Sequence, residues 1–290
     1  MTVVNNTEMW QFLFLLLGLL IFLLGFIFLY RKSRSFRFYI KYLGFNFVIM
    51  LSAIHWTWVG LFHPFDVDNF HRCSGILYNF LVRAYSIRVK IEGREIFDTL
   101  KKKNFIIVAN HQSSLDVFTL LQATPRRTTF LAKKELLFAP LFGFAAWLFG
   151  IVFVNRSNAK SARNVMDKTV KLMRDKKINL WIFPEGTRSQ TGTLLPFKKG
   201  AFHLAVQAQL PIVPIVIQDY SSIFNKKNKA FEHGIFRVKV LDPISTDGLT
   251  ADDVGELTDH VRQVMLKVFH ENDSSGSHQD SVTAGETKNE

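Results

Sequence analysis

The sequence predicts an α/β domain, built on a mainly parallel sheet flanked by helices and attached to an N-terminal hydrophobic helical hairpin. Two observations lead to this fold class. Residues 1–65 hold two long apolar stretches without charge, of the length that enters a bilayer. From residue 86 onward, short apolar runs alternate with amphipathic helical patterns, as in strands joined by helices. We therefore divide the chain into a membrane anchor (1–65), an α/β domain (66–270) and a polar tail (271–290) that we expect to be disordered.

The composition favours a membrane environment and anionic partners. Of the 290 residues, 48% are hydrophobic, and the mean hydropathy is +0.11. A single cysteine, Cys73, excludes a framework of disulfides within the chain. The formal charge is +12 at pH 7, and because the last 20 residues carry −4, the first 270 carry +16. A body this basic favours nucleic acid, anionic lipid headgroups or a phosphorylated substrate as its partner.

The first hydrophobic segment is long enough to cross a bilayer. Residues 12–29 are wholly apolar, and Trp10 and Tyr30 flank them in the manner of interfacial aromatic residues. We therefore predict a helix near 11–30. A cleaved signal peptide is disfavoured, because the basic residues follow the apolar run and no A-x-A pattern is present.

Two further apolar segments follow. The stretch 43–62 is uncharged but contains polar residues, and we predict a second helix that either spans the membrane or returns within one leaflet. The basic connector at 31–41 would then lie in the cytoplasm. A third apolar stretch, 136–154, contains Pro140 and Gly143 and belongs either to the buried core or to the membrane interface.

Apolar patterns predict five strands in the body. Continuous apolar runs at 105–109, 180–183 and 212–217 predict strands, and that at 105–109 is typical of a strand covered on both faces. Alternation of apolar and basic residues predicts two half-buried strands at 87–91 and 236–240. Pro214 should push its strand towards an edge of the sheet or a bulge, because proline lacks an N–H donor. Helical periodicity covers residues 162–173, and Thr250 with Asp253 predicts a capping box at the start of a last helix.

Several common catalytic motifs are missing from the sequence. It contains no P-loop, no Gly-x-Ser-x-Gly elbow, no His-Glu-x-x-His and no cysteine cluster. Nucleotide hydrolysis by a P-loop, an α/β-hydrolase and the common zinc enzymes are therefore disfavoured. No nucleic-acid recognition motif is present either, so we expect no nucleic-acid partner.

His111 and Asp116 form the first candidate catalytic pair. His111 follows the predicted strand 105–109, and Ser113 or Ser114 is placed to cap the next helix. The two side chains can meet if His111 lies in the turn before this helix and Asp116 in its first turn. Asp116 would then orient the imidazole, which takes a proton from a hydroxyl group. The alternative is a surface turn whose acidic residue stabilises the start of the helix.

The same spacing recurs elsewhere in the chain. His63 and Asp68 are also five residues apart, but no predicted strand precedes them. We therefore expect the chemistry at His111 and not at His63.

Residues 183–189 form a second candidate site, directly after a predicted strand. Loops at the carboxyl ends of parallel strands commonly hold ligands. Arg188 offers a planar fork of donors to a phosphate, and the backbone N–H groups of Gly186 and Thr187 are placed to assist. Glu185 either orients Arg188 or caps a turn. The alternative is a polar turn without a ligand.

Other basic residues are candidates for anion binding. Lys133, Lys134 and Arg156 flank the third apolar stretch, where they either extend from a membrane-adjacent patch to water or complete an anion site with Arg188. The lysine runs at 101–103 and 226–229 are either solvated or attract anionic lipid headgroups.

Taken together, four segments resemble the sequence blocks of the glycerolipid acyltransferases. They are the His-x4-Asp block at 110–116, the block ending in an arginine at 153–156, the Glu-Gly-Thr-Arg block at 183–188 and the proline-containing block at 210–215. All four occur in the family's order. The sequence looks most similar to the eukaryotic 1-acyl-glycerol-3-phosphate acyltransferases, including the stretch 195–202.

The resemblance implies the glycerolipid acyltransferase fold and transfer of a fatty acyl group from acyl-CoA to the 2-hydroxyl of lysophosphatidic acid. The products would be phosphatidic acid and free CoA. Residues 66–270 would be the acyltransferase domain, with acyl-CoA as co-substrate and no cofactor or metal. Lysophosphatidic acid and the phospholipid membrane are the expected partners, and we expect an integral protein of the endoplasmic reticulum membrane.

The resemblance also assigns roles to individual residues. His111 would be the general base and Asp116 the residue that orients it. The implied acceptor site holds the phosphate with Arg188, Arg156 and Lys134, and it also contains Glu185, Gly186 and Thr187.

Three alternatives stand beside this function. Relatives that use glycerol 3-phosphate or other lysophospholipids share the motifs, so the acceptor is not fixed. An inert membrane lipid-binding module predicts loss of His111 or Asp116, and both are present. A lipid hydrolase with Ser113 or Ser114 as nucleophile would release fatty acid without any lysolipid.

Overall fold

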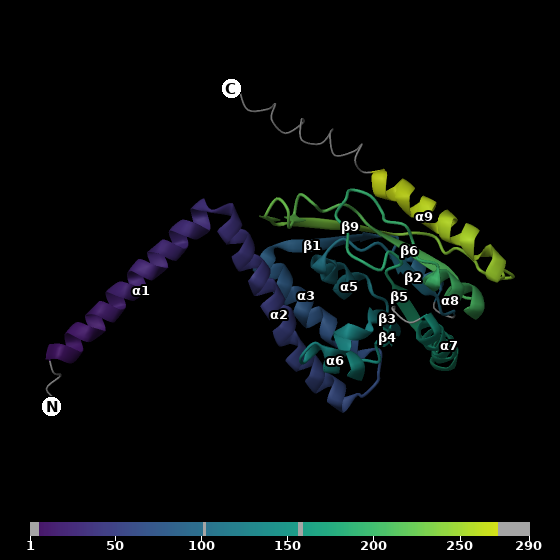
Figure 1. Cartoon of the computed structure of the whole chain (residues 1–290), viewed down its shortest axis with the longest axis horizontal. Coiled ribbons are helices and arrows are strands. Elements are labelled where there is room, and N and C mark those ends of the chain that lie inside the picture. Colours follow the sequence, from purple (N-terminus) through teal and green to yellow (C-terminus); the bar gives the residue numbers. More distant parts are fainter. Residues whose placement is uncertain (1–5, 101–102, 156–158, 272–290) are drawn as a thin grey trace, which may run out of the picture.

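The computed structural model describes residues 6–100, 103–155 and 159–271. The predicted tail therefore lies outside the described residues, except for Glu271. Figure 1 shows a layered α/β body with one helix, α1, projecting away from it.

Helices alternate with strands from residue 69 to residue 217, and the strands between residues 212 and 240 follow one another without a helix between them. The helices are α1 (Asn6–Lys32), α2 (Arg34–Phe62), α3 (Asn69–Tyr85), α4 (Ile96–Thr99), α5 (Val117–Ala123), α6 (Phe142–Leu148), α7 (Ala159–Lys176), α8 (Gly200–Ala208) and α9 (Val254–His270). Three 3-10 turns are η1 (Ser114–Asp116), η2 (Lys134–Phe138) and η3 (Ala251–Asp253). The strands are β1 (Ile87–Glu92), β2 (Ile106–Ala109), β3 (Thr128–Lys133), β4 (Val152–Val154), β5 (Asn179–Ile182), β6 (Ile212–Ile217), β7 (Phe224–Asn225), β8 (Ala230–Phe231) and β9 (Gly234–Val240).

Seven strands form the main sheet, in the order β1-β9-β6-β2-β5-β3-β4. The strands β6, β2, β5, β3 and β4 run parallel to one another. The strands β1 and β9 are parallel to each other and antiparallel to the other five. The prediction of an α/β fold with a mainly parallel sheet is confirmed.

Helices cover both faces of the sheet (Figure 1). Ile106 and Val108 face the core formed with α7, α8 and α9, whereas Ile107 and Ala109 face the opposite side. A further cluster joins α2, α3, α5 and α6 to the sheet. Because consecutive residues of β2 are buried on opposite faces, the strand has to be apolar throughout, which explains its continuous run of hydrophobic residues.

The second N-terminal helix begins earlier than the sequence indicated. Instead of a connector at 31–41 and a helix near 43–62, the chain breaks only at Ser33, and α2 begins at Arg34. The Ser33 hydroxyl accepts the N–H of Phe36 at 3.2 Å, which caps the new helix. Arg37 donates to the carbonyl of Tyr30 at 3.0 Å, at the end of α1. Basic residues are good helix formers, so a basic segment by itself predicts no break.

The helix α2 packs against the body along its length. Phe38, Phe45 and Trp56 are buried on one face, and each contributes about 1.5–3 kcal/mol of hydrophobic stabilisation. Near its end, a Cβ atom on Gly60 would come within 2.7 Å of the Leu148 Cβ of α6, so the helices meet where no side chain fits. The opposite face of α2 and the whole of α1 expose large apolar side chains.

Two strands of the sheet were not predicted. β3 lies between β5 and β4, and β4 is the edge strand, formed by the last three residues of the apolar stretch 136–154. The rest of this stretch forms η2 and α6, whose Ala145 and Leu148 are buried while Phe144 and Trp147 are exposed. A strand of three residues is too short to show a period of two, which explains why the pattern did not reveal it.

Pro214 lies in an interior strand, at a bulge. β6 is not an edge strand, because β9 and β2 flank it. Its pairing with the β9 segment joins Ile212 to Ile244 but Ile215 to Val240, so the partner segment has one extra residue opposite Pro214. The missing N–H of proline falls where the regular pairing is interrupted, and of the two predicted alternatives the bulge is confirmed.

Candidate active site

The predicted motif residues gather at one edge of the sheet. The strands β2, β5, β3 and β4 are parallel neighbours, so their carboxyl ends lie on the same side. His111 follows β2 by two residues, Arg188 lies in the loop after β5, and Lys134 follows β3 directly. Arg156 lies outside the described residues, two positions after the end of β4. The carboxyl edge is therefore the candidate active site.

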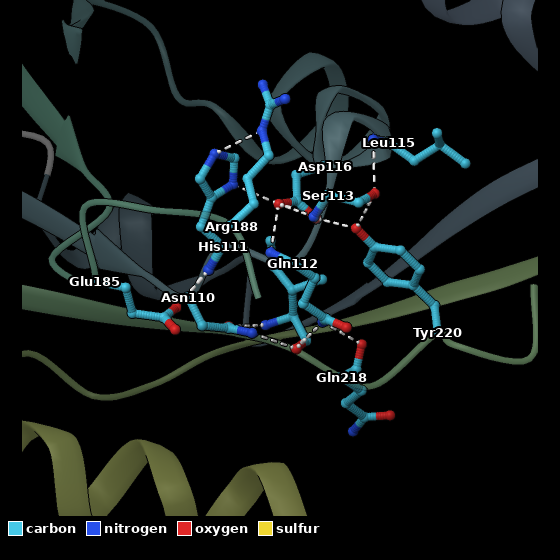
Figure 2. A network of polar contacts seen from close by, with 11 residues as sticks. Asn110, His111, Gln112, Ser113, Leu115, Asp116, Glu185, Arg188, Gln218 and Tyr220 are labelled. Carbon is cyan, nitrogen blue, oxygen red and sulfur yellow. Dashed lines mark hydrogen bonds and ion pairs between the residues drawn. The ribbon is translucent and has the colours of Figure 1, made fainter. Parts of the chain in front are cut away.

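His111 and Asp116 form a hydrogen-bonded pair. Nδ1 of His111 lies 2.6 Å from Oδ2 of Asp116 (Figure 2). Ser113 caps η1 by accepting the N–H of Leu115 at 2.9 Å, so Asp116 lies in the first turn, as predicted. The side chain of Asp116 is 1% exposed and that of His111 18% exposed. Because the carboxylate holds Nδ1–H, the lone pair of the neutral imidazole is on the outward-facing Nε2.

Asn110 and Gln112 attach the catalytic turn to the end of β6. The amide of Asn110 donates to the carbonyl of Ile217 at 2.9 Å and accepts its N–H at 2.8 Å. Gln112 Nε2 donates to the carbonyls of Ile217 and Gln218, at 2.9 and 2.8 Å. These bonds bridge more than a hundred residues of sequence, so the position of His111 depends on the assembled sheet.

Glu185 fixes the backbone of the same turn. Its Oε1 accepts the N–H of His111 at 2.7 Å, and its Oε2 accepts the N–H of Leu195 at 3.0 Å. The side chain is buried, which raises the pKa of Glu185 above its ordinary value, while the two N–H donors oppose this shift. The carboxylate is thus occupied by backbone groups, and it does not orient Arg188 as the sequence had allowed.

The loop after β5 also contacts the imidazole. The ring of Phe183 stacks on His111 at 4.1 Å between centroids, and the N–H of Ser189 donates to the carbonyl of His111 at 2.9 Å. Gly186 has a φ of +71°, a conformation that glycine adopts without strain. The turn at Gly186 leaves Thr187 and Arg188 exposed.

Arg188 reaches the free nitrogen of His111. Its Nε donates to Nε2 of His111 at 3.2 Å (Figure 2). An exposed guanidinium therefore lies beside the outward-facing nitrogen of a carboxylate-oriented histidine. This arrangement can take a proton from a hydroxyl group and bind an anion close to it.

The structure also places the other residues that the sequence singled out. Lys134 is exposed at the start of η2. His63 caps the end of α2, and the carboxylate of Asp68 accepts the N–H of Arg127 at 2.7 Å. Burial raises the pKa of Cys73 to about 11, so its thiol is protonated at neutral pH.

Sequence reasoning missed Tyr220, which lies beside Asp116 in Figure 2. Its hydroxyl donates to Oδ1 of Asp116. Tyr220 follows β6 by three residues, at the same edge of the sheet as His111. The signal in the sequence that could have indicated Tyr220 was its position just after the predicted strand 212–217.

Comparison with known proteins agrees with this geometry. The family model described as Acyltransferase matches residues 88–218. The chain is 39% identical to human 1-acyl-sn-glycerol-3-phosphate acyltransferase alpha, over 92% of this chain and 93% of that protein. It is also 39% identical to the 1-acyl-sn-glycerol-3-phosphate acyltransferase of Saccharomyces cerevisiae, over 79% of this chain and 74% of that protein.

A solved structure shares the fold. The crystal structure of the 1-acyl-sn-glycerophosphate acyltransferase PlsC from Thermotoga maritima matches with a TM-score of 0.65 and 26% identity. The match covers 83% of this chain and 98% of that one. The likeness therefore extends over 74–98% of the length of these three relatives, and this chain belongs to the 1-acyl-sn-glycerol-3-phosphate acyltransferase family.

Proposed function

We propose that this chain transfers a fatty acyl group from acyl-CoA to the sn-2 hydroxyl of 1-acyl-sn-glycerol 3-phosphate, giving phosphatidic acid and free CoA. The observation that carries the proposal is the His111–Asp116 pair, whose outward nitrogen lies beside Arg188. The relatives named above support this choice of acceptor.

His111 acts as the general base in this reaction. As the acceptor hydroxyl attacks the thioester carbonyl, Nε2 takes its proton and a new C–O bond forms. Asp116 stabilises the resulting imidazolium through Nδ1–H. The C–S bond then breaks, and the imidazolium returns the proton to the departing sulfur, so no covalent intermediate with the enzyme is needed.

Arg188 binds the acceptor phosphate, together with Arg156 and Lys134. Gly186 and Thr187 complete the same site, and Glu185 holds the backbone of His111 in place. In the structure, Arg188 donates to the nitrogen that has to accept the proton. The charged phosphate is a stronger hydrogen-bond acceptor for the guanidinium than the imidazole is. When the phosphate binds, Arg188 therefore moves from Nε2 to the phosphate, and the lone pair of Nε2 becomes free.

The contacts of Ser113 disfavour a hydrolase that uses this residue as its nucleophile. Its Oγ accepts the N–H of Leu115 at 2.9 Å and lies 2.8 Å from the hydroxyl of Tyr220. The side chain is buried, and Nε2 of His111 faces Arg188 instead. A nucleophilic serine needs a base within hydrogen-bond distance, and Ser113 is directed elsewhere.

We further propose that the enzyme is an integral protein of the endoplasmic reticulum membrane. Within the described residues, two helices, α1 and α2, are long and apolar enough to cross a membrane, and no residue in the apolar window of α1 is buried. Next to the junction of these helices, Lys229 lies 4.8 Å from the ring centroid of Tyr39 and Lys226 lies 5.0 Å from that of Tyr42. These lysines support a surface that faces anionic headgroups.

The test is acyl transfer in washed membranes with a panel of acceptors. We expect phosphatidic acid to form from acyl-CoA only with lysophosphatidic acid, and not with glycerol 3-phosphate, lysophosphatidylcholine or no acceptor. The activity should stay in the pellet after an alkaline carbonate wash. Transfer to another acceptor alone would overturn the assignment of lysophosphatidic acid as the acceptor. Release of fatty acid without any acceptor would indicate a hydrolase. Activity in the wash supernatant would contradict the integral membrane location.

Replacing Arg188 should weaken binding of the acceptor. In Arg188→Ala, we expect the KM for lysophosphatidic acid to rise about 10- to 100-fold, the loss typical of a hydrogen bond to a charged group, with the KM for acyl-CoA unchanged. The matched control is Arg126→Ala, an exposed arginine just before β3 at the opposite edge of the sheet. Steady-state kinetics with each substrate varied separately decide the result. A selective loss of affinity for acyl-CoA would contradict the assignment.

A further inference from the structure

Tyr220 connects the catalytic pair to the end of β6. Its hydroxyl donates to Oδ1 of Asp116, the carboxylate oxygen that His111 does not use (Figure 2). The side chain is almost fully buried, and its ring stacks on Phe236 at 4.1 Å between centroids. The hydroxyl therefore has a fixed position.

The two oxygens of Asp116 are served by different parts of the chain. Oδ2 accepts from Nδ1 of His111 at 2.6 Å and from the backbone N–H groups of Gln112 and Ser113, at 2.8 and 3.1 Å. Within the described residues, Oδ1 accepts its hydrogen bond from the hydroxyl of Tyr220, which lies more than a hundred residues from Asp116 in the sequence. Rotation of the carboxylate about its Cβ–Cγ bond would break both sets of bonds together.

The direction of the hydrogen bonds follows from the chemistry of the groups. Burial, and then the negative charge of Asp116, raise the pKa of Tyr220 well above its ordinary value, so the hydroxyl is protonated. A carboxylate only accepts, so Tyr220 donates to Asp116. The Ser113 hydroxyl accepts the N–H of Leu115 and therefore has its own proton available for the oxygen of Tyr220.

We propose that Tyr220 is a positioning residue for the acyl transfer: it fixes the rotation of the Asp116 carboxylate and withdraws part of its negative charge from His111. This inference rests on the function proposed above. A donor on Oδ1 lowers the attraction of the carboxylate for the imidazolium, and it holds Oδ2 in line with Nδ1. Both effects act through Asp116, and Tyr220 itself does not touch the substrates.

The test is Tyr220→Phe, which keeps the stacked ring and removes only the hydroxyl. We expect kcat to fall about tenfold, within the range for one hydrogen bond to a charged group, with both KM values within about twofold of the wild type. The acid limb of the pH profile of kcat/KM should move to higher pH, because a carboxylate that has lost a donor holds the imidazolium more strongly.

Tyr78→Phe provides the matched control. Its hydroxyl accepts the N–H of Val89 at 3.1 Å, between α3 and β1, so the same atom is removed at a structural hydrogen bond. This variant should lower the thermal midpoint slightly and leave the pH profile in place. If Tyr220→Phe lowers stability alone, with kcat and the pH profile of the wild type, the inference is overturned.

A second measurement separates this inference from the proposed function. The titration of the His111 ring, followed by NMR of histidine-labelled protein without substrate and assigned with His111→Gln, needs no turnover. Its midpoint should lie at higher pH in Tyr220→Phe than in the wild type and Tyr78→Phe. Identical midpoints in all three proteins would overturn the role of Tyr220 even if transfer is observed. If the wild type shows no acyl transfer but the midpoint of His111 is shifted in Tyr220→Phe, only the proposed acyltransferase function would be overturned.

Discussion

His111→Ala should lower kcat for acyl transfer by at least about 1,000-fold, because the variant loses the group that takes the hydroxyl proton. Folding should survive the change. The backbone of His111 keeps its bonds to Glu185 and Ser189, and Asp116 keeps its donors from the backbone and from Tyr220. Product formation from labelled acyl-CoA and the thermal midpoint in detergent check both expectations.

His63→Ala is the matched control for that variant. His63 has the same spacing to an aspartate, but it is exposed at the end of α2, away from the strand that presents His111. It should retain wild-type kcat. Transfer by His111→Ala at more than a tenth of the wild-type rate, in folded protein, would exclude His111 as the general base.

Glu185→Gln should produce the second-largest loss, through the position of His111. Both carboxylate oxygens accept backbone N–H groups, and glutamine replaces one acceptor with an NH2 donor. A buried N–H without an acceptor costs about 1–3 kcal/mol. Displacement of the catalytic turn by about 1 Å is sufficient for a loss of about 100-fold in kcat.

Two further variants keep this prediction falsifiable. Glu185→Asp retains two acceptor oxygens on a shorter side chain and should lie between glutamine and the wild type in kcat and thermal midpoint. Glu95→Gln makes the same chemical change at an exposed position and should match the wild type. A Glu185→Gln variant with wild-type kcat would show that the carboxylate is dispensable for holding His111.

Local patterns were sufficient for most of the fold. The continuous apolar run of β2 predicted a strand covered on both faces, and the structure buries its residues in two separate cores. The spacing of Thr250 and Asp253 predicted the start of the last helix, and the capping box is present. Such features depend on neighbours within a few residues, which the sequence displays directly.

Features that depend on distant partners escaped prediction. The cap at Ser33 and the packing of the helix on the body set the start of α2. The basic residues in its first turns do not indicate where the helix begins. The strand β4 has three residues and exists because β3 lies beside it. The packing of α2 and the pairing of β4 with β3 are not local, whereas the Ser33 cap lies three residues from its partner and was overlooked in the sequence.

At the site, the sequence was sufficient to predict the participants: a histidine and an aspartate in a turn between strand and helix, and an arginine in the loop after another strand. Tertiary structure decided that Nε2 of His111 faces Arg188, that Glu185 binds backbone groups and that Tyr220 completes the hydrogen bonds of Asp116. The reason is physical. Helix periodicity and capping act over three or four residues, whereas a buried carboxylate takes its donors from any segment that the sheet brings next to it.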